Sequence, residues 1–341
     1  MTLKEIAEQA DVSISTVSRV LNHPEINVAS KAVRERIWQI VNASGYIPNG
    51  AARALKSGSS QTDSAQSPKY LYSLIATSPD ERLDDTFYTR LVDGIEREIF
   101  RHNFFLDFTF YASDMNIKDI KQHLDERSAE GLIILGRFQP PLYNQMRQYF
   151  KNIVYAGLNT IDVPCDQVIC DGYQASYDMV HYFHSLGHRE IAFIGPASDV
   201  RQLGYLNAMK HLHLTINRKH ISGSILPSLS NGYEAMSDLL KKSPDFTALC
   251  CADDTLAIGA LRASKDFGKQ VPDDISIMGI IDLETAQYVS PMLSSYQVPL
   301  EEMGSMTAKL LLDRINGGHR LPMKCYLPYT MVRRESCKKR R

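Results

Sequence analysis

The spacing of hydrophobic residues changes across a polar stretch between residues 57 and 68. Before this stretch, apolar residues recur every three or four positions, a period that predicts short amphipathic helices. After it, short apolar runs alternate with helical patterns, which predicts buried parallel strands covered by helices on both faces. The stretch itself, "SGSSQTDSAQSP", is nearly free of apolar residues, as is typical of a linker. We therefore expect a small all-α domain followed by a larger α/β domain.

The α/β part is long enough to hold more than one core. Its apolar runs predict strands at residues 70–78, 104–112, 131–136, 152–158, 166–172, 190–195, 248–252 and 276–280. Its helical patterns predict helices at residues 87–103, 117–128, 174–187, 200–212, 231–243, 255–268 and 301–317. This alternation predicts two doubly wound lobes, one of about 69–160 with 291–322 crossing back, the other of 161–290 with 323–341. Ligands of such folds bind at the carboxyl ends of the strands.

The residue pattern of the N-terminal part predicts three short helices. Thr2 and Glu5 have the spacing of a capping box, a second helix follows a capping Ser13, and a third ends before Gly45. On the second helix, one face is apolar and is formed by Val17, Val20 and Leu21. The opposite face is formed by Ile14, Ser15, Ser18 and Arg19.

Two short helices joined by a tight connection resemble a helix-turn-helix. A recognition helix needs apolar side chains behind and base-reading side chains in front. Arg19 can donate two hydrogen bonds to guanine, Ser15 can bond a base edge or a phosphate, and Ile14 can pack on a thymine methyl. An ordinary surface helix with one exposed isoleucine fits the same pattern, so periodicity alone leaves both interpretations open.

Composition places few further limits on function. The 341 residues are 44% hydrophobic and carry a formal net charge of -1, as an ordinary globular protein does. Residues 1–58 hold seven basic and five acidic residues, a mild excess that permits a polyanionic partner. The sequence contains neither an apolar run near the length of a membrane span nor a signal peptide, so we expect a cytoplasmic protein.

The side chains that carry metal or catalytic chemistry do not form a motif. The six cysteines include no C-x-x-C pair, which favours reduced thiols over a metal or disulfide framework. His181, His184 and His188 recur on one predicted helix, but no acid or cysteine joins them at ligand spacing. Asp253 and Asp254 are adjacent, yet neither a nucleophile motif nor a P-loop accompanies them. We expect no enzyme, no metal and no cofactor.

Longer motifs carry a family resemblance. "TLKEIAEQADVSISTVSRVLN" and "SGYIPNGAARALKSG" are similar to the N-terminal signature of the lactose-repressor/galactose-repressor (LacI/GalR) family. Four later segments follow in that family's order: "SLGHREIAFIG", "CADDTLAIGALRAS", "QVPDDISIMG" and "SPMLSSYQVPLEEMG". The resemblance covers nearly the whole chain. It implies a helix-turn-helix DNA-binding domain at residues 1–48, a hinge helix at 49–57, a linker at 58–68 and a two-lobed, periplasmic-binding-protein-like domain at 69–341.

The resemblance assigns residues to an operator-DNA surface. Ile14, Ser15 and Arg19 take base-reading positions, and "YIPNGAARALK" matches a hinge that becomes a helix in the minor groove. In this hinge, Leu55 matches a leucine that is inserted between the central base pairs and bends the duplex. Ala52 matches a small residue that packs at the floor of the groove. The full set of expected DNA-binding residues is Thr2, Ser13, Ile14, Ser15, Thr16, Ser18, Arg19, Asn22, Tyr46, Asn49, Ala52 and Leu55.

The resemblance also assigns residues to a small-molecule effector, expected to be a sugar such as a galactoside. Charged side chains can orient sugar hydroxyls, and aromatic rings such as Phe87, Tyr88 or Phe138 can stack on a pyranose face. The expected effector-binding residues are Thr77, Ser78, Phe87, Phe138, Asp171, Arg201, Asp253, Ile281 and Gln297. The chain departs from the family at "GIIDLE", where Ile281 replaces the first of two acids and leaves only Asp282.

These features predict a homodimeric transcriptional regulator, a repressor of a carbohydrate-utilisation operon under allosteric control by its effector. The basic tail "RRESCKKRR" lacks heptads, so a tetramerising coiled coil is not expected. One alternative is a global, catabolite-type regulator that acts with a phosphocarrier protein partner, since such regulators share these motifs. A sugar-binding module without DNA binding is a second alternative, which the helix-turn-helix pattern disfavours.

Overall fold

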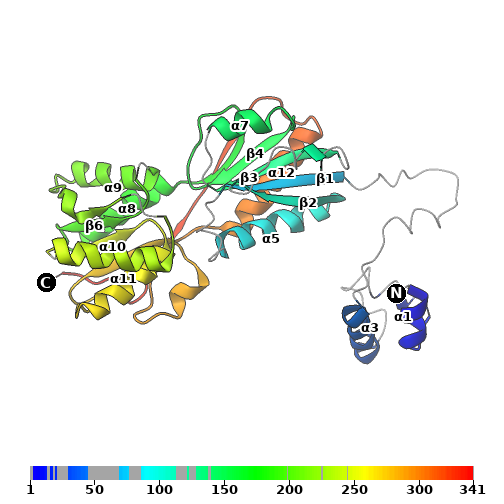
Figure 1. Ribbon diagram of the computed structural model, residues 1–341, viewed down its shortest axis with the longest axis horizontal. Coiled ribbons are helices and arrows are strands. Elements are labelled where there is room, and N and C mark those ends of the chain that lie inside the picture. Colours follow the sequence, from blue (N-terminus) through cyan, green and yellow to red (C-terminus); the bar gives the residue numbers. More distant parts are fainter. Residues whose placement is uncertain are drawn as a thin grey trace. The chain divides into compact units, whose positions relative to one another are not determined.

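The computed structural model describes residues 3–13, 16–17, 20, 30–44, 69–76, 86–112, 121–122, 128–136, 140–197, 199–223, 226–243 and 245–340. The chain divides into two compact units, residues 1–67 and 68–341 (Figure 1). Each unit is described by itself. No helix among these residues has both the length and the hydrophobicity needed to cross a bilayer.

The N-terminal unit has a small apolar core between short helices. Its described helices are α1 (Leu3–Gln9) and α3 (Lys31–Ser44), and the backbone of residues 16, 17 and 20 is also helical. The buried side chains of this core are Ile6, Ala7, Ala10, Val17, Val20 and Ile37. Arg36 Nη1 donates to the carbonyl of Ala10 over 3.3 Å and so links α3 to the end of the first helical segment.

The first lobe of the larger unit contains a parallel six-stranded sheet in the order β11-β5-β4-β3-β1-β2. Its strands are β1 (Lys69–Ala76), β2 (Phe104–Tyr111), β3 (Ala129–Gly136), β4 (Ile153–Gly157), β5 (Asp166–Cys170) and β11 (Lys324–Leu327). Most of these positions are buried, as expected for strands covered on both faces.

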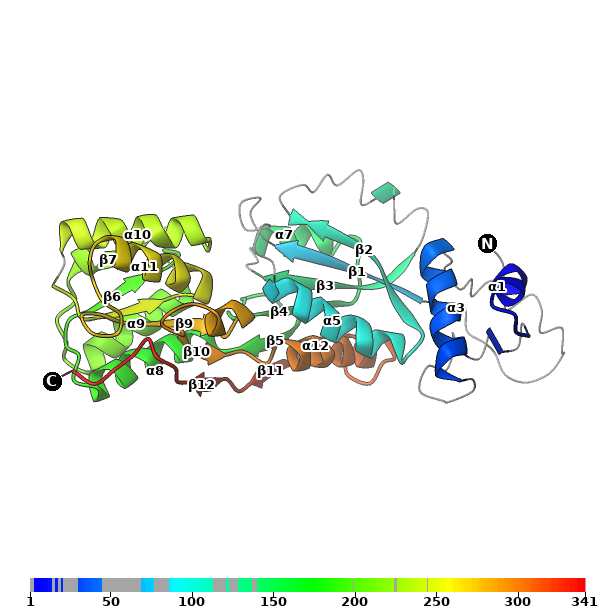
Figure 2. The same cartoon turned by 90° about the horizontal axis from the view of Figure 1, so that it is seen from below.

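Helices cover the two faces of this sheet. On one face lie α5 (Thr86–Phe100) and α12 (Leu300–Ile315), side by side in Figure 2. These two helices approach closely because Gly94 and Gly304 face each other's backbone: a Cβ on Gly94 would lie 2.3 Å from the carbonyl oxygen of Glu301. On the other face, α7 (Pro140–Met146) packs on Tyr72 and its neighbours.

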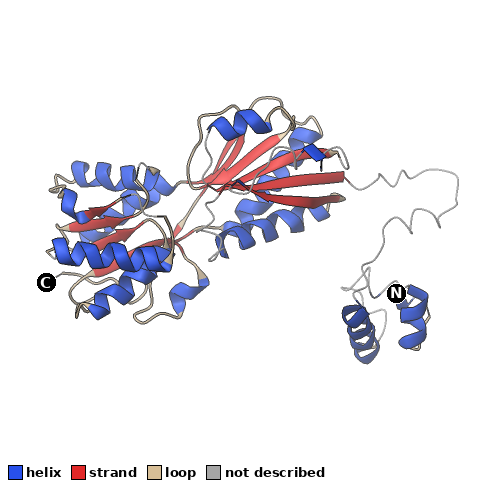
Figure 3. Ribbon diagram, in the orientation of Figure 1, coloured by secondary structure: helices blue, strands red, loops and turns tan. Residues whose placement is uncertain are grey.

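The second lobe repeats this design. Its sheet has the order β12-β10-β9-β8-β6-β7, parallel except for the β10–β12 pair. The strands are β6 (Ile191–Ile194), β7 (Ile221–Ser222), β8 (Ala248–Cys251), β9 (Ser276–Ile281), β10 (Ser294–Gln297) and β12 (Thr330–Val332). One face carries α8 (Gly172–Ser185) and α9 (Val200–His211), and the other carries α10 (Leu229–Lys242) and α11 (Asp254–Asp266), as Figure 3 shows. Short turns η3 (Arg218–His220) and η4 (Glu284–Gln287) complete it.

The strand pairing corrects the expected lobe boundary. The sequence pattern places the division near residue 160, but β5 pairs with β4 and therefore lies in the first lobe, so the chain crosses after Cys170. In the same way β10 belongs to the second lobe and β11 to the first. A run of apolar residues indicates a strand but not its partner, and partners decide the lobe.

Several short elements were not predicted. They are α7, β7, β10, β11 and β12, most of which are too short for a periodic pattern. The helix expected at 117–128 lies almost wholly outside the described residues; residues 121 and 122 are helical.

The basic C-terminal tail lies along the second lobe. Ser336 Oγ donates to the carbonyl of Ile277 over 2.6 Å. The backbone N–H of Arg340 donates to the carbonyl of Leu186 over 2.8 Å. The tail is therefore part of this lobe's fold as far as residue 340.

Candidate functional site

Two of the twelve residues assigned to DNA are described by the structure, Ser13 and Thr16. The backbone N–H of Thr16 donates to Ser13 Oγ over 3.2 Å, and the two hydroxyl oxygens are 2.8 Å apart. Ser13 therefore caps the second helical segment, as its position in the sequence suggests. The other ten lie outside the described residues: Thr2, Ile14, Ser15, Ser18, Arg19, Asn22, Tyr46, Asn49, Ala52 and Leu55.

The buried side of the second helical segment matches the predicted apolar face. Val17 and Val20 are 0% and 1% exposed and pack on α1 and α3 through Ile6 and Ile37. The third residue of that face, Leu21, is outside the described residues. The described part of the segment thus has the apolar side that a helix-turn-helix requires.

In the second lobe, polar side chains gather where parallel strands end. Asp199 follows β6, Asp253 follows β8 and Asp282 follows β9. Since parallel strands end at one edge of the sheet, these residues share that edge. Of the expected effector residues, Asp171, Arg201, Asp253, Ile281 and Gln297 are also near strand ends or helix starts of this lobe.

Arg201 is a buried cation at this edge. Its side chain is 4% exposed, and Nε and Nη2 donate to Asp199 Oδ1 and Oδ2 over 2.8 Å each. Nη1 donates to the carbonyl oxygen of Ala252 over 2.8 Å. These bonds use three of the five N–H groups of a guanidinium and fix its plane.

The electrostatics of Arg201 depend on two carboxylates. Burial by itself lowers the pKa of Arg201, but the charge and hydrogen bonds of Asp199, followed by the charge of Asp253, outweigh burial and raise it. Asp253 is 2% exposed and caps α11, where it accepts from the N–H of Leu256 over 2.9 Å. The guanidinium is therefore charged and held in place by its own chain.

Asp171 reaches the same neighbourhood from the crossing segment. It caps α8 by accepting from the N–H of Gln174 over 3.0 Å. A Cβ on the following residue, Gly172, would lie 3.1 Å from Arg201 Cγ, so this helix begins directly beside the arginine. The structure therefore brings Asp171, Arg201 and Asp253 together.

Ile281 and Gln297 form a second part of the edge. They are register partners at the ends of β9 and β10, and Gln297 Nε2 donates to Asp282 Oδ2 over 3.4 Å. Ile281 is 9% exposed and has a φ of 117°, a conformation that β-branched residues rarely adopt. Asp282 also has a positive φ and pairs with Arg334 over 2.6 Å. Backbone strain of this kind is concentrated at ligand sites.

The first lobe approaches this edge with aromatic side chains. Burial, and after it the negative charge of Asp199, raises the pKa of Tyr155, so this β4 residue lies close to the start of α9. Tyr88 is the last and smallest of the groups that raise the pKa of Arg201. Arg90 of α5 and Glu284 of η4 are 3.7 Å apart and form an exposed ion pair between the lobes.

The aromatic residues expected to stack on a ligand have different surroundings. Phe87 is half-buried, packs on the main core and meets Tyr88 edge-to-face with ring centroids 5.0 Å apart. Phe138 is outside the described residues, as are Thr77 and Ser78. Tyr88, unlike Phe87, is among the groups that raise the pKa of Arg201.

Sequence reasoning missed three residues of the site: Asp199, Asp254 and Tyr155. Asp199 immediately precedes a predicted helix, so the preference of aspartate for N-caps could have identified it. Asp254 is fully buried; its Oδ1 accepts from Ser295 Oγ over 2.6 Å and its Oδ2 from the N–H of Leu283 over 2.7 Å. Burial raises its pKa to about 8. Its hydrogen bonds link the end of β8 to β10 and to the segment after β9.

Of the three histidines expected on one helix, His181 and His184 lie on α8, whereas His188 lies beyond its end at Ser185, so the expected helix was too long. His188 follows α8 and bonds to Thr247 Oγ1 over 2.9 Å and to the carbonyl of Lys338 over 3.1 Å. The ring of His181 lies beside that of Tyr177, with centroids 4.7 Å apart and planes inclined by 32°. In the described part of the chain, no three His, Cys, Asp or Glu residues are grouped so as to hold a metal ion.

Two protein families match separate parts of the chain. Residues 2–49 match the family described as bacterial regulatory proteins, lacI family. Residues 180–337 match the periplasmic binding protein-like domain. The first covers the helical unit and the second covers most of the second lobe with its strand-end site.

Several relatives match over nearly their whole length. The HTH-type transcriptional repressor MelR of Bacillus subtilis is 28% identical over 98% of this chain and 97% of its own. The HTH-type transcriptional repressor PurR of Klebsiella pneumoniae is 27% identical over 92% of this chain and 90% of its own. A solved structure, the transcriptional regulator CelR–cellobiose complex, superimposes with a TM-score of 0.71, is 26% identical, and covers 98% of this chain and 99% of that chain.

These matches agree with the architecture derived above. A helical unit with an apolar-backed second segment precedes two doubly wound lobes, and the repressors that match do so over both parts. The chain belongs to the lacI family of bacterial regulatory proteins.

Proposed function

We propose that this regulator represses a carbohydrate-utilisation operon and that a sugar or sugar derivative, bound between the two lobes, controls its affinity for the operator. Two chains would bind one near-palindromic operator, since one recognition helix serves each half-site. The observation that carries the effector half is the buried Asp199–Arg201 pair at the carboxyl edge of the second lobe, approached by Tyr88 and Tyr155.

The chemistry of this edge suits a polyhydroxylated ligand. A sugar hydroxyl both donates and accepts, so neighbouring hydroxyls can accept from a guanidinium and donate to a carboxylate. The aromatic rings supply an apolar surface for the C–H face of a pyranose. The CelR structure was solved with cellobiose, and this relative supports the same class of ligand for the present chain.

Coupling to DNA follows from the two-lobed design. A ligand that contacts both lobes favours the arrangement in which its contacts with both are made. In the mechanism we propose, this arrangement separates the hinge segments of the two chains, their helices melt, and operator affinity falls. Couplings of this kind are typically about 1–3 kcal/mol, or about 5- to 150-fold in affinity.

The effector half is tested by fluorescence anisotropy on a DNA fragment from upstream of the protein's own gene. Melibiose, galactose, lactose, cellobiose and ribose are added in turn, and one of them should lower operator affinity within that range. Unchanged affinity with every sugar, in a protein that binds the fragment tightly, would contradict sugar control but not DNA binding.

The DNA half is tested by Arg19→Ala. Loss of a bidentate contact to guanine should reduce the preference for operator over unrelated DNA by about 1–3 kcal/mol. Arg262→Ala, which removes an exposed arginine paired with Asp266 in the second lobe, is the matched control and should bind as the parent does. Equal selectivity of the Arg19 variant and the control would remove Arg19 from the reading surface.

A further inference from the structure

Three helices begin beside the strand-end site, and each is capped by an aspartate of this chain. Asp171 caps α8, Asp199 caps α9 through the N–H of Arg201 over 2.9 Å, and Asp253 caps α11. The N-terminus of a helix carries a partial positive charge and unpaired N–H groups, which make it a common anion site. Here the chain's own carboxylates already occupy these positions.

The arginine of the site is neutralised in the same way. Both oxygens of Asp199 accept from Arg201, and this carboxylate caps α9 as well, so one side chain offsets two positive groups. The side chains of Asp199 and Arg201 are 3% and 4% exposed, so water screens the pair little. Asp253 adds a second buried carboxylate near the same guanidinium.

The other described cations around this edge are also paired. Arg334 Nη1 lies 2.6 Å from Asp282 Oδ1, and Arg90 pairs with Glu284 across the lobes. Among the described residues, the two carboxylates around Arg201 outnumber it. A ligand entering there meets a neutralised guanidinium with two N–H groups left over by its three hydrogen bonds.

We propose that the effector is uncharged, and that Asp199 is the specificity-determining residue that excludes phosphorylated and carboxylated sugars from this site. The inference rests on the proposed function, in which a sugar binds at this edge. A neutral hydroxyl can accept from the remaining N–H groups and donate to carboxylate oxygens. A phosphate group has mainly acceptors and would bring its charge beside Asp199 and Asp253, and like charges placed together in a buried site are strongly unfavourable.

The wild-type protein is tested first with matched pairs of ligands. Thermal shift and calorimetry compare glucose with glucose 6-phosphate, galactose with galactose 6-phosphate, and ribose with ribose 5-phosphate. Inorganic phosphate is a further probe, against sodium chloride at equal ionic strength. We expect any member that binds to be neutral, with its phosphorylated partner at least about tenfold weaker, and phosphate to stabilise no more than chloride does.

Asp199→Asn and Asp199→Ser then test the residue. Both replacements retain a side chain that caps a helix, but they remove the charge that neutralises Arg201. Each should lower the preference for the neutral member by about tenfold or more, and inorganic phosphate should now stabilise the protein beyond chloride. Asp238→Asn is the matched control, because it removes an exposed charge of α10 that pairs with Lys242 and should leave both readouts unchanged.

A wild-type protein that binds a phosphorylated sugar as tightly as its neutral partner would overturn the inference and leave sugar control intact. Phosphate stabilisation of the wild type that Arg201→Gln abolishes would overturn it as well. If the Asp199 variants unfold, these wild-type comparisons still decide the question. Absence of binding by every sugar would instead contradict the proposed function, while the phosphate probe still reports on the charge balance at Arg201.

Discussion

The two lobes each contain a buried aspartate in a bidentate pair with an arginine, but the pairs lie at opposite edges of their sheets. Asp166, the first residue of β5, pairs with Arg314 near the end of α12 at the amino edge of the first sheet. Asp199 pairs with Arg201 beyond the carboxyl end of β6 in the second lobe. The same kind of aspartate–arginine pair therefore occurs at two different positions relative to the sheets of one chain.

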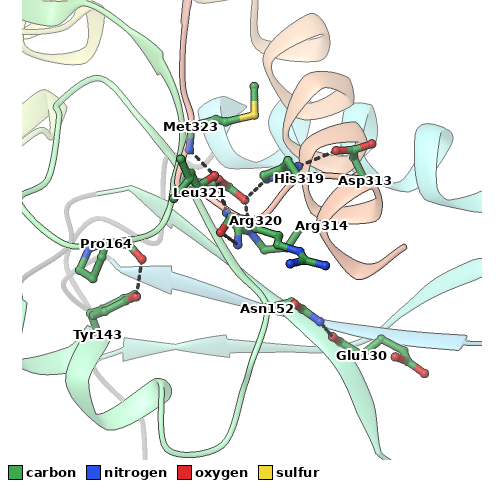
Figure 4. A network of polar contacts seen from close by, with 11 residues as sticks. Glu130, Tyr143, Asn152, Pro164, Asp313, Arg314, His319, Arg320, Leu321 and Met323 are labelled. Atoms are coloured by element: carbon green, nitrogen blue, oxygen red, sulfur yellow. Dashed lines mark hydrogen bonds and ion pairs between the residues drawn. The ribbon is translucent and has the colours of Figure 1, made fainter. Parts of the chain in front are cut away.

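The pair of the first lobe fastens one part of the chain to another. Figure 4 shows Arg314, His319 and Met323 converging on one point, where the N–H of Met323 donates to Asp166 Oδ1 over 2.8 Å. His319 Nε2 lies 2.9 Å from Asp166 Oδ2, and Arg314 Nη2 also donates to the carbonyl of Leu321 over 3.1 Å. The segment between α12 and β11 is thereby held against β5.

The pair of the second lobe has fewer partners of this kind and faces another lobe. Besides its bonds to Asp199, the guanidinium donates a hydrogen bond to the carbonyl of Ala252, and it interacts electrostatically with Tyr88 and Tyr155 of the first lobe. The comparison teaches that burial and ion pairing alone do not identify a ligand site. Position at the carboxyl ends of parallel strands, beside helix starts and a second lobe, separates the two cases.

Arg314→Ala should give the largest loss of stability. It leaves the carboxylate of Asp166, which is 0% exposed, without its main counter-charge, and such losses cost about 3–5 kcal/mol. Urea unfolding of the full chain measures this loss, and the effector response of the folded fraction should persist. An undiminished unfolding free energy would show that His319 and Met323 suffice to hold Asp166.

Arg201→Ala should lower stability by a comparable or smaller amount, about 3 kcal/mol, because it too leaves a buried carboxylate unpaired. Unlike the first variant, it should abolish the effector response and retain operator binding. Fluorescence anisotropy with operator DNA, without and with the inducing sugar, measures operator binding and the effector response. If the effector response persists, neither arginine pair takes part in ligand binding, and the ligand binds elsewhere.

Asp254→Asn should remove a pH dependence of the unfolding free energy that arises in the second lobe. Burial raises the pKa of Asp254 to about 8, so the folded state favours the neutral carboxyl. Its contribution to stability is present below the ordinary pKa near 4 and is lost as the pH rises through about 8. The wild-type unfolding free energy should fall across this interval relative to that of the variant; parallel pH profiles would contradict the raised pKa.

His319→Gln should have the smallest effect, about 1 kcal/mol, on the first lobe. Burial by itself lowers the pKa of His319, but its hydrogen bonds to Asp313 and Asp166 outweigh burial and raise it. The stabilisation is therefore complete below the ordinary pKa near 6.5 and lost as the pH rises through the raised value. In urea unfolding, the difference in unfolding free energy between the wild type and the variant should be larger at pH 6 than at pH 9. The effector response should be the same in both proteins.

Most long elements could be predicted from the sequence because their patterns are strong. The helices α5 and α8 to α12 and the strands β1 to β6, β8 and β9 lie within a few residues of their expected positions. The pattern failed for β10, β11 and β12, whose few residues carry no clear period, and for the lobe to which β5 belongs. For the site, motif positions led to Arg201 and Asp253 but not to Asp199.

The sequence by itself determined the division into a helical and an α/β part, the apolar face of the second helix and the family of the chain. These properties depend on local periodicity and on motifs of contiguous residues, which sequence contains directly. Tertiary structure decided which carboxylate holds Arg201, which strands share a sheet, and that Asp166 and Asp199 lie at opposite edges of their sheets. Those outcomes depend on pairing between distant segments, such as β5 with α12, and on burial, which sets how strongly charges act on one another.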